Sequence, residues 1–277
     1  MGYRNFVPAV WSESIARELE RKLVFAEDCN RQYEGDVKKA GDSVRILAVG
    51  KPTITSTTDP EIVLGKAENV EDTALTMKIR QIAYYNYKVD DIDKRQSVGN
   101  VMDCLSKETT EELGNVVDKY IADLAKDPMA LKDSAASYAV NKDNILSKID
   151  DALRKLYEND VNPMSDIVLT VSPRFYMLLK QAYSALSTDN VKIMENGRVG
   201  RYGSIEVKMS NNVAVDESGN ELLMLRTKRA IAYVNPLTHT EAYRPEEGFS
   251  DAVKGFILFD AKIVRPKEMI VLNVKYN

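Results

Sequence analysis

Histidine and cysteine are almost absent from this chain of 277 residues, which holds one histidine and two cysteines. The single histidine, His239, cannot supply a histidine-based metal cluster, and we interpret it as a surface or turn residue rather than a catalyst. Cys29 and Cys104 lie far apart, form no CxxC pair and have no histidine partner. This pattern fits a reducing cytoplasm and argues against a catalytic thiol.

Long apolar runs and an excess of positive charge are also missing. The 38 Lys and Arg residues face 42 Asp and Glu residues, and the net charge of −4 argues against a general nucleic-acid-binding surface. No apolar run approaches the roughly 20 residues of a membrane span, and the first residues show no charged-then-apolar targeting pattern. The chain is 44% hydrophobic and 29% charged, so it can bury a sizeable core as one or two domains.

The longest periodic stretch, about 93–127, predicts a single amphipathic helix. Asp93 and Gln96 resemble a capping box, and Asp127-Pro128 is a suitable stop. At 1.5 Å per residue the helix would span about 50 Å, so something flat must lie along it. The apolar residues recur at steps of three and four and form one stripe: Val98, Val101, Met102, Leu105, Thr109, Leu113, Val116, Tyr120 and Leu124.

Gly114 lies inside this predicted helix, opposite the stripe. Glycine in a helix interior costs about 0.5–1 kcal/mol relative to alanine, so the helix should be weakest there. Two interpretations stay open: another backbone packs closely at Gly114, or the helix bends there as a hinge.

Two stretches predict strands that lie before this helix. The first is Ser43–Val49, and the second is Leu75–Val89, in which apolar and polar residues alternate. The connection of about 25 polar residues between them suggests a long hairpin that projects from the body, because such loops are uncommon inside compact domains. Within it we single out four residues as contacts with another subunit: Thr57, Thr58, Asp59 and Pro60.

The N-terminal segment carries large apolar side chains on a charged helix that Ser12 can cap. A lone segment of this kind has little of its own to pack against. It lies either across its own chain or against a neighbour, and under the second alternative four residues are contacts between subunits: Trp11, Ile15, Leu19 and Phe25.

The rest of the chain mixes helices and strands, with Asn144–Glu158 and Arg174–Leu186 as helices. Strands are expected from the hydrophobic pattern and the turn residues between them: Asp166–Val171, Val191–Met194, Ile205–Met209, Glu221–Leu225, Ala230–Val234, Phe256–Ile263 and Glu268–Val274. Strands far apart in the sequence are expected to share a sheet, which gives an α+β fold class.

Two patterns are candidates for chemistry. Asp90, Asp91 and Asp93 could hold a hard cation, although a strand end followed by a helix cap explains them as well. Gly197, Gly200 and Gly203, with arginines between them, superficially suggest a phosphate loop. Their spacing fits no phosphate-binding motif and a strand follows, so a turn or interface loop is the better interpretation.

Five stretches of the sequence resemble, in the same order, segments of tailed-bacteriophage major capsid proteins. They are LVFAEDCNRQYEG at 23–35, GDSVRI at 41–46, YKVDDIDKRQS at 87–97, GRYGSIEVKMSNN at 200–212 and RAIAYV at 229–234. The resemblance implies the Hong Kong 97-type capsid fold. The implied parts are an N-terminal arm (1–30), a first peripheral strand region (31–49), an extended hairpin loop (50–86), a peripheral domain with the long spine helix (87–129), an axial domain (130–235) and C-terminal strands of the peripheral domain (236–277).

The resemblance also implies a structural function without catalysis, cofactor or metal. Copies of the chain would form the hexamers and pentamers of an icosahedral virion shell that encloses double-stranded DNA, assembled in the host bacterial cytoplasm. No long helical segment precedes the arm, so assembly would need a separate scaffolding protein or none. A portal, and in some shells a decoration protein, would be further partners.

Two alternatives stay open at this point. Within the same fold, the chain could form an encapsulin-like compartment that encloses a cargo protein instead of a genome. From a different class, it could be a cytoplasmic metal-dependent enzyme that uses Asp90, Asp91 and Asp93.

Overall fold

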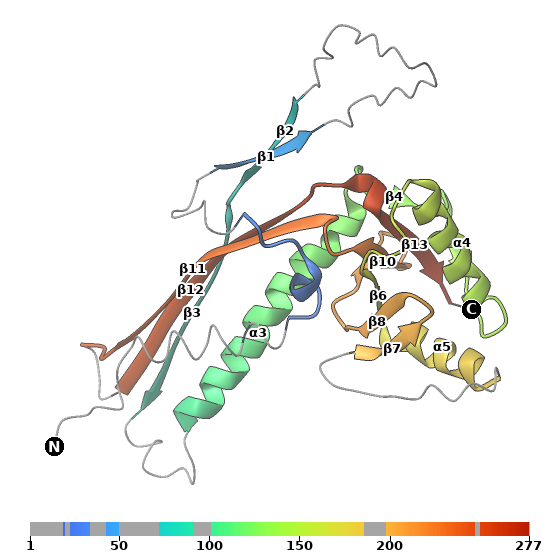
Figure 1. Ribbon diagram of the computed structural model, residues 1–277. Helices are drawn as coiled ribbons and strands as arrows, with labels where there is room; N and C mark the ends of the chain where they lie inside the picture. The colour runs from blue at the N-terminus through green and yellow to red at the C-terminus, as the bar shows by residue number, and fades with distance from the viewer. Residues whose placement is uncertain are drawn as a thin grey trace, which may run out of the picture.

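The computed structural model describes residues 19, 23–33, 43–49, 72–90, 101–185, 198–246 and 250–276. Within these ranges the chain forms a three-stranded sheet, an eight-stranded sheet and a separate two-stranded hairpin. Figure 1 shows the hairpin standing away from the two larger sheets, with one long helix running beside the three-stranded sheet. The expected α+β class is therefore confirmed.

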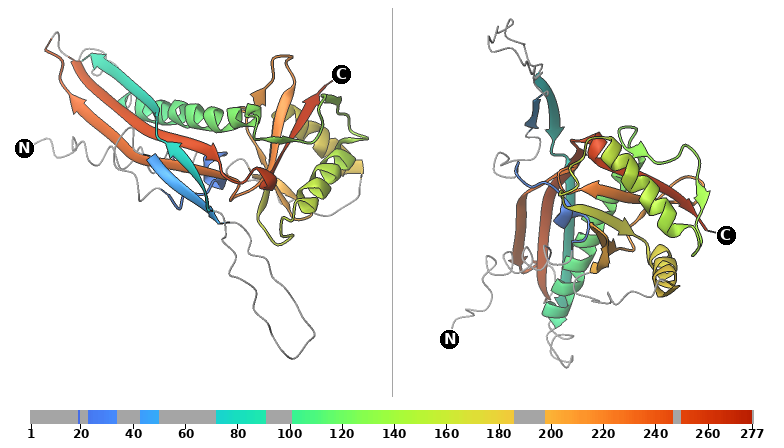
Figure 2. Two further views of the ribbon diagram at one scale, coloured as in Figure 1. Left: turned by 90° about the horizontal axis from the view of Figure 1, so that it is seen from above. Right: turned by 45° about the vertical axis from the view of Figure 1, so that its right-hand side comes forward.

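The three-stranded sheet consists of β3 (Gln81–Asp90), β11 (Ile231–Tyr243) and β12 (Ser250–Ile263), in the antiparallel order β11-β12-β3. Helix α3 (Val101–Asp123) lies along one face of this sheet (Figure 2). Alternate residues of β3, among them Tyr85 and Val89, turn towards the helix, while Ile82 and Tyr84 face outward. The alternation expected for Leu75–Val89 is thus confirmed, because a half-buried strand shows one face to the core.

The eight-stranded sheet has the order β4-β13-β10-β6-β8-β7, with β5 paired to β13 and β9 paired to β10. Its strands are β4 (Leu131–Lys132), β5 (Tyr138–Ala139), β6 (Ile167–Val171), β7 (Arg198–Tyr202), β8 (Ile205–Met209), β9 (Ala214–Val215), β10 (Glu221–Thr227) and β13 (Met269–Lys275). Leu223 and Leu225 of β10 pack in a core with α4 (Ile145–Glu158) and α5 (Pro173–Ala185). Leu222 and Met224 belong to the second core, against α3. The sheet is therefore buried on both faces.

Strands β1 (Ser43–Val49) and β2 (Asp72–Lys78) form the projecting hairpin, with Ser43 opposite Lys78 and Val49 opposite Asp72. At its base, Val44, Ile46 and Met77 are buried in a small core with Ala232, Val234 and Leu258 from the three-stranded sheet. The expected projecting hairpin is confirmed, and its root is held by apolar contacts within its own chain.

Helix α3 differs from the expected stripe in one respect. Leu113, Val117 and Ile121 are buried, whereas Val116 remains 47% exposed. The helix contacts the sheet on one side and the N-terminal segment on another, so its buried arc is displaced from the stripe that periodicity suggested. It ends at Asp123 and continues as the 3₁₀ turn η3 (Leu124–Lys126), close to the expected stop, while its expected start at 93 lies outside the described residues.

The strand pairing corrects three of the expected ranges. The extended hairpin loop was expected at 50–86. In the structure the hairpin begins with β1 at Ser43 and its second strand ends at Lys78, and from Gln81 onward the chain pairs with β12 of the three-stranded sheet. Strand β11 continues across the expected boundary at 235. Strand β13 joins the eight-stranded sheet instead of the three-stranded sheet beside α3, where the expected peripheral domain placed it. Strand partners distant in sequence leave no local signal, which is why these limits were wrong.

Other expected elements agree more closely. Helices α4 and α5 and strands β6, β8, β10, β12 and β13 appear within a few residues of the expected limits, apart from the longer start of β12. The segment around β7 was expected as a turn or interface loop. Gly200 in β7 and Gly203 in the turn that follows have φ of 140° and 56° and shape the β7–β8 hairpin. The strand expected at 191–194 lies outside the described residues.

Gly255 of β12 supplies a test of how β12 packs with β3 and β11. A Cβ at this position would lie 2.5 Å from the hydroxyl oxygen of Tyr85 and 2.6 Å from the carbonyl oxygen of His239. We predict that Gly255→Ala lowers the free energy of unfolding by about 1–3 kcal/mol, because the sheet must shift to admit the methyl group. Urea denaturation of the unassembled subunit measures this.

Gly114→Ala is the matched control for this prediction, because a Cβ there would meet Leu19 Cδ1 at an ordinary 3.6 Å. Equal stability of the Gly255→Ala variant and the parent would contradict the packing argument.

Candidate functional site

The described part of the N-terminal segment, 23–33, is bound by side chains from α3 and the eight-stranded sheet. Its centre is the 3₁₀ turn η1 (Ala26–Asp28). Asp118 of α3, only 2% exposed, accepts hydrogen bonds from the backbone N–H groups of Val24 (2.8 Å), Phe25 (3.0 Å) and Ala26 (3.2 Å). The carboxylate therefore caps a turn that lies more than 90 residues away in the sequence.

Arg226 of β10 binds the same segment from the other side. Its side chain is fully buried and donates to the carbonyl oxygens of Phe25, at 2.8 Å, and Asp28. Side chains of opposite charge thus bind the two kinds of backbone group in the turn: Asp118 accepts from its N–H groups and Arg226 donates to its carbonyls. The turn is thus held through both kinds of its backbone polar groups.

Two lysines pair with the acidic side chains of the turn. Lys208 of β8, fully buried, places Nζ 2.7 Å from Glu27 Oε2 and 2.6 Å from Asp28 Oδ2. Lys228 places its Nζ 3.2 Å from Asp28 Oδ1. Removing one partner of a buried ion pair typically costs about 3–5 kcal/mol, because the other charge stays buried without compensation. We call these six residues the anchor cluster: Glu27, Asp28, Asp118, Lys208, Arg226 and Lys228.

The segment continues from the anchor cluster to the three-stranded sheet. Asn30 forms a parallel bridge with Ala232: its N–H donates to the carbonyl of Ile231 at 2.8 Å, and its carbonyl accepts from the N–H of Tyr233 at 2.9 Å. Arg31 then lies over the ring of Tyr233 at 5.5 Å. The anchored segment therefore contacts α3 and both of the larger sheets within eight residues, 24–31.

Burial shifts the protonation equilibria of two groups at this site. Loss of hydration raises the pKa of the Asp118 carboxyl from its ordinary 3.8 to about 6, and outweighs the three backbone hydrogen bonds and the charge of Arg226. Burial also raises the pKa of the Cys29 thiol, partly offset by Arg226. Cys29 is thus a protonated core residue that donates to the carbonyl of Phe25.

None of the expectations drawn from the sequence included the anchor cluster. One signal was visible: Lys208, Arg226 and Asp118 each interrupt an otherwise apolar pattern, as in Leu-Leu-Met-Leu-Arg at 222–226. A charge at an inward-facing position predicts a buried partner of opposite charge. The sequence could not identify that partner, since Asp28 lies 180 residues before Lys208.

The patterns considered for chemistry do not form a site in the described part of the chain. Asp90 ends β3, and Asp91 and Asp93 lie outside the described residues. Among the residues with a described position, no three His, Cys, Asp or Glu side chains gather so that they could hold a metal ion. His239 is exposed on β11, with its ring 5.8 Å from that of Phe256.

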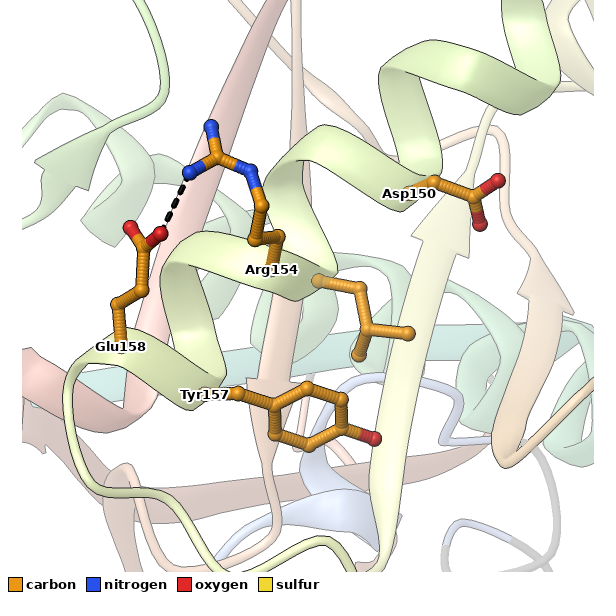
Figure 3. Close-up of a pocket in the computed structure, with 5 residues that line it drawn as sticks. Asp150, Arg154, Tyr157 and Glu158 are labelled. Atoms are coloured by element: carbon orange, nitrogen blue, oxygen red, sulfur yellow. Dashed lines mark hydrogen bonds and ion pairs between the residues drawn. The ribbon is translucent and has the colours of Figure 1, made fainter.

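An open hollow lies on the outer side of α4 (Figure 3). All its lining residues come from that helix: Asp150, Leu153, Arg154, Tyr157 and Glu158. Arg154 and Glu158 pair with each other, while Asp150 and Tyr157 bond to Tyr202 and Ser204 at the β7–β8 turn. Asp150 and Tyr157 therefore join α4 to the β7–β8 turn, whereas Arg154 and Glu158 pair within the helix, and none of these groups is arranged around a ligand.

No protein-family model matches the sequence, and no curated protein does. Solved structures do match. A chain of Mycobacterium phage Che8 is 25% identical, with 90% of each chain covered and a TM-score of 0.72. The capsid of cyanophage P-SCSP1u is 14% identical, with 92% of this chain and 89% of that chain covered and a TM-score of 0.69. The chain has the Hong Kong 97-type capsid fold.

The capsid fold also includes a more distant neighbour, the encapsulin SrpI of Synechococcus elongatus. It is 10% identical, with 87% of this chain and 85% of that chain covered and a TM-score of 0.55. Both alternatives within the fold are thus represented, and the structures of phages Che8 and P-SCSP1u are more similar to this chain than SrpI is. Within the described ranges, no helix is long and apolar enough to cross a membrane.

For this capsid fold, the sequence predicted eight residues as contacts between subunits. Leu19 and Phe25 are only 1% and 2% exposed in the core of their own chain, so the structure corrects the prediction for these two: they fix the N-terminal segment in place. The other six lie outside the described residues and stay predictions: Trp11, Ile15, Thr57, Thr58, Asp59 and Pro60.

The raised pKa of Asp118 predicts a pH dependence of stability. Because the folded-state pKa lies near 6 and the unfolded value near 3.8, the folded chain takes up a proton in this interval that the unfolded chain does not. Protonation of Asp118 therefore stabilises the fold fully below pH 4, and this contribution is lost as pH rises through 6. The free energy of unfolding should fall by about 2–3 kcal/mol across the interval. Urea denaturation near pH 4 and near pH 7.5 measures it.

Asp118→Asn should remove this pH-dependent contribution, so the stability difference between parent and variant changes across the interval. Asp123→Asn is the matched control on the same helix, because the Asp123 side chain is 44% exposed and pairs with the exposed Lys126. Parallel pH profiles for the parent and Asp118→Asn would contradict the assignment.

Proposed function

We propose that the protein is the major capsid protein of a tailed phage or prophage. Its copies form the hexamers and pentamers of an icosahedral virion shell around double-stranded DNA. The observation that carries this proposal is the similarity of fold to phage structures over about nine tenths of the chain, with 25% identity to the chain of phage Che8. The fold neighbours favour a shell protein over the metal-dependent enzyme.

Features of the structure support self-assembly. The β1–β2 hairpin stands away from the body and offers little surface to its own chain beyond its root (Figure 1). In a shell, such a hairpin lies across a neighbouring subunit and adds interface area instead of core. The net charge of −4 suits a container, because an inner wall that bound DNA tightly would hinder packing.

The finer assignments belong to the same proposal. A separate scaffolding protein or none, a portal and an optional decoration protein complete the assembly, which takes place in the bacterial cytoplasm. Electron microscopy of the purified protein tests the main statement: closed shells are expected, and a small soluble oligomer would contradict it. Nuclease-protected DNA inside particles from infected or induced cells supports the phage shell, whereas an enclosed protein cargo would favour the encapsulin-like alternative.

The hairpin provides the first test of assembly. Replacing residues 53–68 by a short turn shortens the connection between β1 and β2. It keeps the buried root residues Val44, Ile46 and Met77. We predict a folded, soluble subunit that no longer closes into shells, because the lost residues contribute to contacts between subunits. Electron microscopy and the unfolding transition of the subunit are the two measurements. Shells of parental size would contradict the prediction, as would a chain that cannot fold.

Gly114 provides a second test, which concerns expansion of the shell. A Cβ at Gly114 would make only ordinary contact with Leu19, so packing in this structure does not require glycine. We propose that α3 bends at Gly114 in a compact precursor and straightens as the shell expands. Gly114→Ala should then favour the straight helix by about 1 kcal/mol per chain and make particles expand earlier. Time-resolved scattering measures the rate.

Val116→Ala is the matched control for the hinge. Val116 lies two residues further along α3 and is 47% exposed, so alanine there also favours the helix without removing the glycine. Earlier expansion in Gly114→Ala alone supports a hinge at this position. Equal rates in both variants and the parent would show that Gly114 is not a hinge.

A further inference from the structure

One edge of the three-stranded sheet is long, regular and unpaired in the described part of the chain. Strand β3 pairs with β12 over all ten of its residues, from Gln81 opposite Phe259 to Asp90 opposite Ser250. It is the last strand in the order β11-β12-β3, so its other side faces no described strand. The backbone N–H and C=O groups on that side are a template for another strand.

Other outer strands of the two large sheets carry features that oppose such pairing. Strand β11 contains Pro236 and a register shift between Val234 and Leu237. Strand β7 has a register shift after Arg198, and Gly200 there has φ of 140°. Strands β4 and β5 have two residues each. Bulges, prolines and short length protect many sheet edges, and β3 has none of these three; its protection is limited to the charged residues Lys88 and Asp90.

The outward face of β3 also exposes apolar surface. Tyr84 is 82% exposed and Ile82 is 53% exposed, on the face opposite α3. Tyr84 lies beside Phe256 in the neighbouring strand, and Phe256 lies beside His239. An edge with open backbone groups and exposed rings fits a partner that is itself a β-strand.

We propose that β3 pairs antiparallel with β3 of a second copy of this chain, across a two-fold axis centred on Tyr85. The inference rests on the proposed shell function, in which identical chains meet in many places. In this register Tyr84 lies opposite Asn86, and Ile82 lies opposite Lys88, whose methylene stem can cover it. Each chain would keep its own strand order, and the three-stranded sheets of the two copies would join into one six-stranded sheet.

Charge favours this register over a neighbouring one. Centring the pair on Tyr84 would set Arg80 opposite Lys88 at both ends, and like charges directly opposite each other destabilise a strand pair. Centring it on Tyr85 sets Arg80, the residue directly before β3, opposite Asp90, the last residue of β3, and these two residue types carry opposite charge. A two-fold contact is self-complementary, so each favourable pair occurs twice.

Disulfide trapping in assembled full-length protein tests the proposal. The background is Cys104→Ser, since Cys104 is exposed, whereas Cys29 is buried and stays. The test variant is Tyr84→Cys/Asn86→Cys, whose positions lie opposite each other. The controls are Ile82→Cys/Asn86→Cys and Tyr84→Cys/Lys88→Cys, which match the registers centred on Tyr84 and Asn86. All four positions are exposed, so the fold should tolerate each change.

After mild oxidation, we expect the test variant to yield at least about fivefold more covalent dimer than either control, because a disulfide forms only between closely opposed positions. Shells that assemble without any covalent dimer would overturn the inference and leave the proposed function intact. More dimer from either control would overturn the register centred on Tyr85. Absence of any shells, also in the parent, would instead count against the proposed function.

Discussion

The carboxylate of Asp118 is the interaction on which the arrangement of this molecule depends. It accepts hydrogen bonds from three backbone N–H groups of a turn in the N-terminal segment, and it lies in the C-terminal part of α3, five residues before the helix ends at Asp123. Arg226 binds the carbonyls of the same turn from the eight-stranded sheet. The turn is bound by both side chains, so it sets the distance between α3 and the eight-stranded sheet. Asn30 then joins the same segment to β11 of the three-stranded sheet.

Burying charged side chains costs hydration free energy, and the anchor cluster buries several of them. Lys208, Arg226 and Asp118 are almost completely buried, so each has lost its hydration and depends on partners supplied by the segment. An apolar contact would tolerate a segment displaced by one residue, whereas a buried charge left without its partner does not. The cluster therefore specifies one position for the segment more than it adds net stability.

Local patterns predicted much of this fold and little of the anchor cluster. The alternation in Leu75–Val89 correctly separated buried from exposed residues, because that signal lies within a few neighbouring positions. Periodicity placed Val116 on the buried face of α3, yet the helix meets the N-terminal segment as well as the sheet, and Val117 is buried instead. The pairing of β13 with β10 joins residues about 50 positions apart, and the pair of Lys208 with Asp28 joins residues 180 positions apart. No local pattern in the sequence carries that information.

The way the chain passes between its two large sheets has a mechanical consequence. Strands β10 and β13 are neighbours in one sheet, and they are joined in sequence through β11 and β12, which are neighbours in the other. Besides the connection from β3 through α3 to β4, tension between the sheets is therefore shared by these two covalent backbones, which run side by side. A pull along them shears several rungs of hydrogen bonds together instead of opening them one at a time, and a single backbone cut leaves the second connection intact. A wall built from such chains resists outward pressure within each subunit as well as between subunits.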